Sequence, residues 1–281
     1  MKLLFIIYSV GVIWNASPVF ADTGRLPNPP FRIVLMWQVQ KDVSIEDIEL
    51  LRQKGVTVVQ AFGILRWSND SVRNYLDLMD RYNIKVVMSL DKLASRIGKE
   101  WTYDRDRAAH FIRKWKDHTG VFAWHLFDEP CNKDKNIPSS FQEKMYTYVK
   151  ALDPSHPILL SFNGTRDEDY ERCFSEKSFD ILDLHAYMND TLSSRQDNLI
   201  TMFNKHSKST YPIIITIRAF RYANVASPPP KDMLQRQYNL FFRKYAITPN
   251  VGFYGWKLNP NVGIIDDPGL MKQFSELQLL Y

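Results

Sequence analysis

Short apolar runs alternate with longer amphipathic segments from residue 32 to the end of the chain. The short runs are rich in valine, isoleucine, leucine and aromatic residues, which is typical of strands buried on both faces of a sheet. The sequence therefore predicts strands at residues 32–39, 56–62, 85–90, 121–127, 157–162, 180–187, 211–220 and 251–258.

The longer segments have the pattern of helices that pack one face on a sheet. In the second of them, Val72, Tyr75 and Met79 recur at helical spacing. Helices are predicted at residues 44–55, 69–84, 104–118, 138–152, 194–209, 229–246 and 268–281. The polar stretch 163–178 leaves a short helix and irregular structure as alternatives.

Local signals mark both ends of the first predicted helix. Ser44 is an N-cap residue, and Asp47 stands at the capping-box position three residues later. Gly55 ends the helix because glycine readily adopts the left-handed backbone of a C-terminal cap.

The strict alternation of strands with helices indicates a parallel sheet in an α/β fold. A count of eight strands in one domain favours a closed (β/α)₈ barrel, a single TIM barrel. The alternative is an open doubly wound sheet, which usually has a glycine-rich turn after its first strand. Residues 37–44, WQVQKDVS, contain no glycine, so the barrel is the better prediction.

Residues 1–21 have the features of a secretory signal peptide. Lys2 gives a basic start, an apolar stretch runs from Leu3 to Trp14, and small residues precede a cleavage position after Ala21. An uncleaved anchor is the alternative, but the apolar stretch is short for a span of about 20 residues. We expect a secreted or periplasmic protein whose barrel comprises residues 22–281. No later stretch is long and apolar enough to cross a membrane.

Charge and motifs exclude several classes of function. The formal net charge is +5, but the positive residues are scattered and do not indicate a nucleic-acid groove. No histidine or cysteine spacing predicts a metal site, no cofactor motif occurs, and the Gly-x-Ser-x-Gly elbow of serine hydrolases is absent. Acid–base chemistry by carboxylates remains. Nothing in the sequence indicates an oligomeric state.

In a closed barrel of this kind, the active site forms at the C-terminal ends of the strands. The fourth strand ends in the adjacent carboxylates Asp128 and Glu129. The other strand ends supply polar and aromatic side chains: Trp37, Gln60, Asp91, Asn163, His185, Tyr187, Arg218, Trp256 and Lys257. Such a rim suits a carbohydrate, because sugars offer hydroxyl groups for hydrogen bonds and C–H faces for aromatic stacking.

Several of these side chains have structural alternatives. Trp37 and Trp256 could simply cover the barrel core. Arg218 could be an ion-pair partner or an electrostatic clamp. His125 lies in mid-strand, and we expect it to be an interior histidine bonded to Asp183.

Two cysteines and three glycosylation sequons bear on the compartment. In an exported protein Cys131 and Cys173 are expected to form a disulfide between the loops after the fourth and fifth strands, with two buried thiols as the alternative. Sequons occur at Asn69, Asn163 and Asn189, and glycans on the active-site face would obstruct it. This favours a bacterial source.

The strand motifs resemble a known family. FAWHLFDEP resembles the acid/base strand of clan A retaining glycoside hydrolases, which often ends Asn-Glu-Pro or Asp-Glu-Pro. DILDLHAY is similar to their His-x-Tyr strand, and GFYGWKL is similar to their eighth strand. The resemblance implies that Glu129 is the general acid/base, that His185 and Tyr187 line the sugar subsite, and that Trp256 forms its floor.

The seventh strand departs from the family pattern. The family has a nucleophilic glutamate there, whereas IIITIRAFRY has Ile217 and Arg218 at that position. Three alternatives follow: hydrolysis assisted by a substrate acetamido group, which Asp128 would orient; a displaced carboxylate such as Asp91 or Asp183; or a barrel that binds glycans without cleaving them. We expect an exported glycoside hydrolase that acts on O-glycosidic bonds through Glu129.

Overall fold

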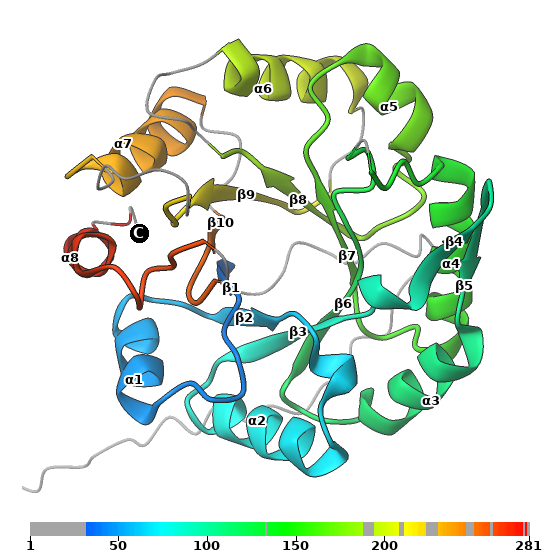
Figure 1. Cartoon of the computed structure of the whole chain (residues 1–281), viewed down its shortest axis with the longest axis horizontal. Helices are drawn as coiled ribbons and strands as arrows, with labels where there is room; N and C mark the ends of the chain where they lie inside the picture. The colour runs from blue at the N-terminus through cyan, green and yellow to red at the C-terminus, as the bar shows by residue number, and fades with distance from the viewer. Residues whose placement is uncertain are drawn as a thin grey trace, which may run out of the picture.

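The computed structural model describes residues 32–132, 134–187, 194–207, 211–222, 230–245, 250–258, 261–277 and 279. The predicted signal peptide lies outside these residues, as does Asn189. Eight parallel strands close into a barrel in the order β1-β10-β9-β8-β7-β6-β3-β2 (Figure 1). Their bounds are β1 Val34–Trp37, β2 Val58–Ala61, β3 Lys85–Ser89, β6 Val121–Asp128, β7 Ile158–Phe162, β8 Ile181–His185, β9 Ile213–Arg218 and β10 Val251–Tyr254. The predicted (β/α)₈ barrel is confirmed.

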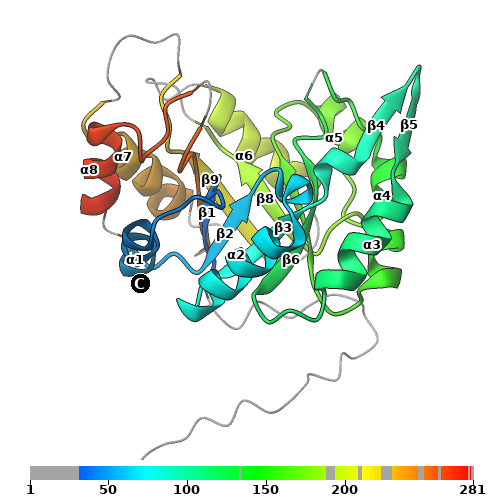
Figure 2. The ribbon, with the colours of Figure 1, turned by 60° about the horizontal axis from the view of Figure 1, so that its bottom comes forward.

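Helices surround the barrel, and Figures 1 and 2 show them on its outer side. They are α1 Ile45–Gln53, α2 Asn69–Arg81, α3 Arg105–Trp115, α4 Ser139–Leu152, α5 Asp167–Cys173, α6 Ser194–His206, α7 Met233–Asn239 and α8 Pro268–Glu276. Three short turns of other helix types join them: η1 Ile64–Arg66, η2 Asp91–Leu93 and the π-helix η3 Leu240–Tyr245. The stretch after β7 thus contains the short helix α5.

The core has two layers, as expected for a sheet covered on both faces. A small apolar group, including Leu35, Val58, Val87 and Ile214, fills the barrel interior. A larger group packs the outer faces of the strands against the helices. Side chains of alternate parity along each strand supply these two layers.

Strand β6 contains a β-bulge that changes this parity. Its pairing with β7 runs from His125↔Leu159 to Phe127↔Leu160, so Leu126 is an extra residue. Leu126 and Phe127 therefore both belong to the outer layer, although they are neighbours in sequence. Beyond the bulge, Asp128 takes the inward parity that His125 has before it.

A two-stranded hairpin was not predicted. It consists of β4 Ala94–Ile97 and β5 Glu100–Tyr103, inserted between β3 and α3. Gly98 takes the first position of its two-residue turn with a φ of 62°, which suits a glycine. Figure 2 shows the hairpin projecting beyond α4.

Candidate active site

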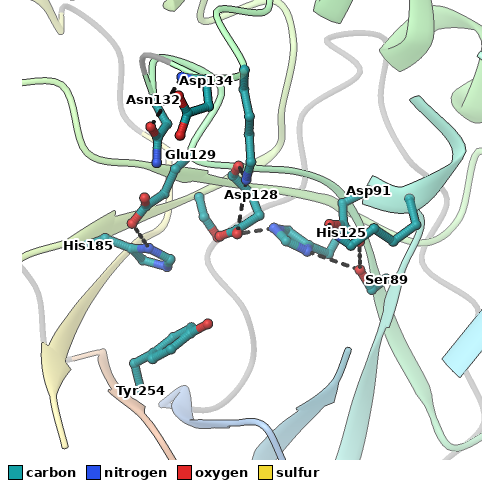
Figure 3. Close-up of polar contacts among 12 residues, drawn as sticks. Ser89, Asp91, His125, Asp128, Glu129, Asn132, Asp134, His185 and Tyr254 are labelled. Atoms are coloured by element: carbon teal, nitrogen blue, oxygen red, sulfur yellow. Dashed lines mark hydrogen bonds and ion pairs between the residues drawn. The ribbon is translucent and has the colours of Figure 1, made fainter. Parts of the chain in front are cut away.

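Glu129 follows directly on β6, at the C-terminal mouth of the barrel. Its backbone has a φ of 50°, a left-handed conformation that is uncommon for a residue with a side chain. Its N–H donates to the carbonyl of Ser161 at the same end of β7 (3.1 Å). Its carboxylate Oε1 lies 2.8 Å from Nδ1 of His185, and Figure 3 shows the two side chains pointing toward one another.

His185 lies between two carboxylates. Its Nε2 is 3.3 Å from Oδ2 of Asp183, on the side opposite Glu129. The Tyr187 hydroxyl is a further 3.0 Å neighbour of Nδ1. Burial is the strongest effect on the His185 pKa and lowers it, but Asp183 and Glu129 together outweigh burial and raise that pKa to about 10. His185 is therefore an imidazolium cation at neutral pH.

Asp128 is held by a lysine from the following loop. Lys135 Nζ donates to its Oδ2 (3.1 Å) and also contacts its backbone carbonyl. Burial alone would raise the pKa of Asp128, but the charges of Lys135 and His185 lower it below its ordinary value. Asp128 Oδ1 is buried and has no hydrogen-bond partner among the described residues.

His125 differs from His185 in its charge state. Its ring nitrogens lie 3.1 Å from Ser161 Oγ and 3.5 Å from Ser89 Oγ, so the expected bond to Asp183 is replaced by contacts with two serines. Burial lowers its pKa and keeps it neutral, since no carboxylate touches the ring. Ser89 in turn donates to Asp91, which lies away from Glu129 in Figure 3.

A pocket of about 660 Å³ opens beside Glu129 and His185. Of the side chains predicted from strand ends, it contains Glu129, Asn163, His185 and Tyr187. Its other lining residues were not predicted to face a pocket, although Cys131 was expected nearby as a disulfide partner: Cys131, Asn132, Thr165, Arg166, Asp169, Ala186, Leu199, Phe220 and Tyr222. Most of these lie in loops beyond the strands, where apolar periodicity gives no signal.

Aromatic rings close one side of the site. The eighth barrel strand, β10, supplies Tyr254 to this group. The Tyr254 ring lies 5.3 Å from that of Tyr187 and 5.8 Å from that of His185. Trp256 instead faces outward and packs on Phe274 of α8, 6.0 Å between rings.

Other predicted site residues lie outside the pocket lining. Trp37 is fully buried, with its ring edge-on to His185 at 5.5 Å, and Gln60 is fully buried at the end of β2. Arg218 places its guanidinium over the Tyr222 ring (5.4 Å) and close to Met233 Sδ (3.2 Å). Lys257 forms an exposed ion pair with Asp42 (2.6 Å).

The expected disulfide is not present, because both cysteines are buried free thiols. The Cys131 thiol donates to the carbonyl of Asp169 (3.1 Å), and Arg172 Nε lies 3.4 Å from the Cys173 sulfur. The neighbouring Cys131 thiol and the Arg172 guanidinium lower the pKa of Cys173 to about 7, against the effect of burial. The prediction that the two residues are neighbours holds, but polar contacts satisfy the sulfurs without a covalent bond.

The described part of the chain contains neither a cluster of metal-binding side chains nor a helix suited to crossing a membrane. No set of three or more histidine, cysteine, aspartate or glutamate side chains there is arranged to bind a metal ion. Among the described helices, none combines the length and the apolar character that crossing a membrane requires.

Replacing Lys135 with methionine should destabilise the fold by about 1–3 kcal/mol at neutral pH, because Asp128 would lose its charged partner. A carboxylate with a lowered pKa stabilises the folded state above its unfolded pKa near 3.8, and this contribution is lost as pH falls through the folded value. The difference from wild type, measured by urea unfolding, should therefore shrink in acid. Lys92, which pairs with Asp91 and is more exposed than Lys135 (55% against 31%), is the matched control, and an equal loss for Lys92→Met would contradict the prediction.

Comparisons with known proteins place this barrel beside glycoside hydrolases. No protein-family profile matches the chain. In sequence it is 26% identical over 98 residues to a probable mannan endo-1,4-beta-mannosidase F of Aspergillus flavus, covering 28% of this chain and 21% of that protein. It is 23% identical over 145 residues to a beta-glucuronidase of Canis lupus familiaris, covering 46% of this chain and 21% of that protein.

Solved structures resemble more of the chain. A beta-D-glucuronidase of Dictyoglomus thermophilum matches with a TM-score of 0.57 and 16% identity, covering 89% of this chain and 51% of that one. A beta-galactosidase from the psychrophilic Marinomonas ef1 matches with a TM-score of 0.62 and 10% identity, covering 86% of this chain and 58% of that one. The chain thus spans about a fifth of the length of the curated relatives (21%) and about half of the first solved structure (51%). It shares its barrel fold with glycosidases, and part of its sequence is similar to theirs.

Proposed function

We propose that this protein is a glycoside hydrolase that cleaves O-glycosidic bonds with Glu129 as general acid/base. The observation that carries the proposal is the position of the Glu129 carboxylate, which lines the pocket at the barrel mouth and contacts His185 at 2.8 Å. Similarity to mannosidase and glucuronidase sequences supports the same reaction class. We also propose export from the cytoplasm, on the sequence of residues 1–21.

The described carboxylates near Glu129 limit the choice of mechanism. Asp183 is fully buried behind His185, and Asp169 is bound at one oxygen by both Arg166 (2.9 Å) and Arg172 (3.2 Å). Arg218 stands at the end of β9. Asp128 differs in its position, because it is adjacent to Glu129 in the chain; one of its oxygens, like Oδ2 of Asp183, has no hydrogen-bond partner among the described residues.

These positions favour a mechanism assisted by a substrate acetamido group. Glu129 would give its proton to the leaving oxygen while the acetamido carbonyl oxygen attacks the anomeric carbon, and Asp128 would accept the acetamido N–H. Glu129, now a carboxylate, would then take a proton from the water that opens the cyclic intermediate. No second catalytic carboxylate is needed for this double displacement, unlike in the usual retaining pair.

The mechanism is tested by comparing N-acetylhexosaminides with the corresponding plain hexosides as aryl glycosides. We expect kcat/KM to be at least about 10²-fold higher for the N-acetylated sugars, since only these carry the nucleophile. Equal cleavage of both series would reject the assistance by Asp128 and leave a displaced carboxylate as the mechanism.

One observation favours a second candidate, a barrel that binds glycans without cleaving them. Glu129 forms an ion pair with His185 (2.8 Å), whereas a general acid must hold a proton that it can give to the leaving oxygen. In this candidate the pocket is a glycan-binding site. Binding to a glycan array without turnover of any aryl glycoside would support it over hydrolysis.

A further inference from the structure

Asp183 is a fully buried carboxylate held by an ordered set of contacts. It lies on β8 with 0% of its surface exposed, and Thr216 Oγ1 on β9 donates to its Oδ1 (2.6 Å). Trp37 Nε1 in turn donates to Thr216 Oγ1 (3.3 Å), which fixes the direction of the threonine hydroxyl. A charge at such a depth is costly unless a counter-charge lies next to it.

The counter-charge is His185, two residues further along the same strand. Asp183 and His185 share the inward parity of β8, so the imidazole stacks above the carboxylate with Nε2 at 3.3 Å from Oδ2. The other ring nitrogen faces Glu129. β6 and β8 are alternate strands of the barrel, and alternate strands place side chains in one layer.

We propose that Asp183 is a positioning residue of this site, which acts through His185 so that Asp183, His185 and Glu129 form one proton relay. This inference rests on the proposed hydrolase function and extends it. It also accounts for the ion pair at Glu129, because the proton that the reaction needs resides on His185 between turnovers.

The relay balances over the two steps of the reaction. In the first step the proton on His185 Nδ1 passes to the Glu129 carboxyl group, which protonates the leaving oxygen as the C–O bond breaks. His185 is then neutral, and Asp183 remains a carboxylate. In the second step a proton from the attacking water passes to Glu129 and back to His185 Nδ1, which restores the starting charges.

Several other groups face His185 and bear on its protonation. Tyr187 and Tyr254 contact its ring, and burial raises the pKa of both phenols, so they stay neutral in the working range. Asp128 adds negative charge, and neutral His125 adds none. Asp183 and Glu129 are thus the direct charged contacts of the imidazole among the described residues.

The relay is tested by titrating the imidazole nitrogens with ¹⁵N NMR in the full chain. The protein has six histidines, and His185→Gln identifies the His185 signal. In the wild type we expect His185 to remain protonated above pH 8, with a pKa of about 10. Asp183→Asn preserves the shape but removes the charge, and should lower that pKa to about 7 or below. Wild-type His185 that is neutral at pH 8, or a titration unchanged by Asp183→Asn, would overturn the relay.

Asp180→Asn is the matched control, because Asp180 is also buried but binds Tyr146 (2.8 Å) and Lys150 (3.3 Å) at the other end of β8. It should leave the His185 titration unchanged. On a cleaved glycoside, Asp183→Asn should lower kcat at least about 10-fold with KM nearly unchanged. A merely structural role would not lower kcat selectively in this way.

The titration needs no substrate, so the two proposals can fail separately. If His185 titrates as expected but no glycoside is cleaved, the hydrolase proposal fails while the charged trio stands as a feature of a binding site. If glycosides are cleaved through Glu129 and Asp183→Asn changes neither the titration nor kcat, the relay alone fails.

Discussion

Glu129→Gln should lower kcat/KM on a cleaved glycoside by about 10²–10⁴-fold, the range that one general acid/base contributes. Glutamine preserves the length and planarity of the side chain and can still hydrogen-bond to His185, but it cannot carry a transferable proton. The variant should therefore retain its fold, with a Tm within a few degrees of wild type. Steady-state kinetics and thermal unfolding of the same preparation measure both effects.

Substrates with different leaving groups distinguish the loss of proton donation from a general disturbance of the pocket. A good leaving group, such as a dinitrophenolate, needs little protonation, so Glu129→Gln should affect its departure far less than that of an alkyl alcohol. An equal loss for both would contradict a role as general acid. Glu143 on α4, which accepts a hydrogen bond from Ser175 (2.6 Å), offers a matched control, and Glu143→Gln should leave kcat/KM unchanged.

Gly252→Ala should destabilise the fold by about 3 kcal/mol or more, because the barrel interior has no room for the added methyl group. Gly252 on β10 is directly opposite Thr216 on β9. A Cβ at residue 252 would lie within 2.9 Å of the Thr216 Cβ and 3.2 Å of its Cα, and would collide with its hydroxyl. The free energy of unfolding in urea measures the loss.

The collision can be relieved from the other side of the contact. Thr216→Ala removes the obstructing hydroxyl, so the double variant should be more stable than the sum of the two single losses predicts. Strict additivity would mean that residue 252 acts through the strand backbone instead. Because Thr216 also holds Asp183, Gly252→Ala should disturb the ion pair of Asp183 with His185 as well.

Features written in local sequence were predictable. The alternation of strands and helices specified a closed barrel, since each strand is buried on both faces. The capping box of Ser44 and Asp47 is formed, and Gly55 has the left-handed backbone (φ 74°) that ends the helix. Glu129 lies at the barrel mouth because it follows a long apolar strand, and this depends on the order of residues alone.

Features that depend on a change of backbone direction were not predictable. Tyr254 and Trp256 have the same parity in an extended strand, but Gly255 has a φ of 123° and turns Trp256 outward toward α8. The turn at Gly98 likewise creates the hairpin within a stretch of mixed polarity. Arg166 and Asp169 reach the pocket from the loop and short helix after β7, where no periodic pattern indicates orientation.

The bulge at Leu126 changes which residues of β6 face the barrel interior. At Ala123 and His125 the odd-numbered residues of β6 point into the barrel, and after Leu126 the even-numbered Asp128 does so. Glu129, next in the chain, would then face outward, but its left-handed backbone returns it to the pocket. Main-chain geometry thus turns Asp128 into the barrel and Glu129 into the pocket, although the two acidic residues are neighbours in sequence. Deleting or inserting one residue in β6 would therefore reorient Asp128 and Glu129, so the site depends on the length of this strand as much as on the identity of its residues.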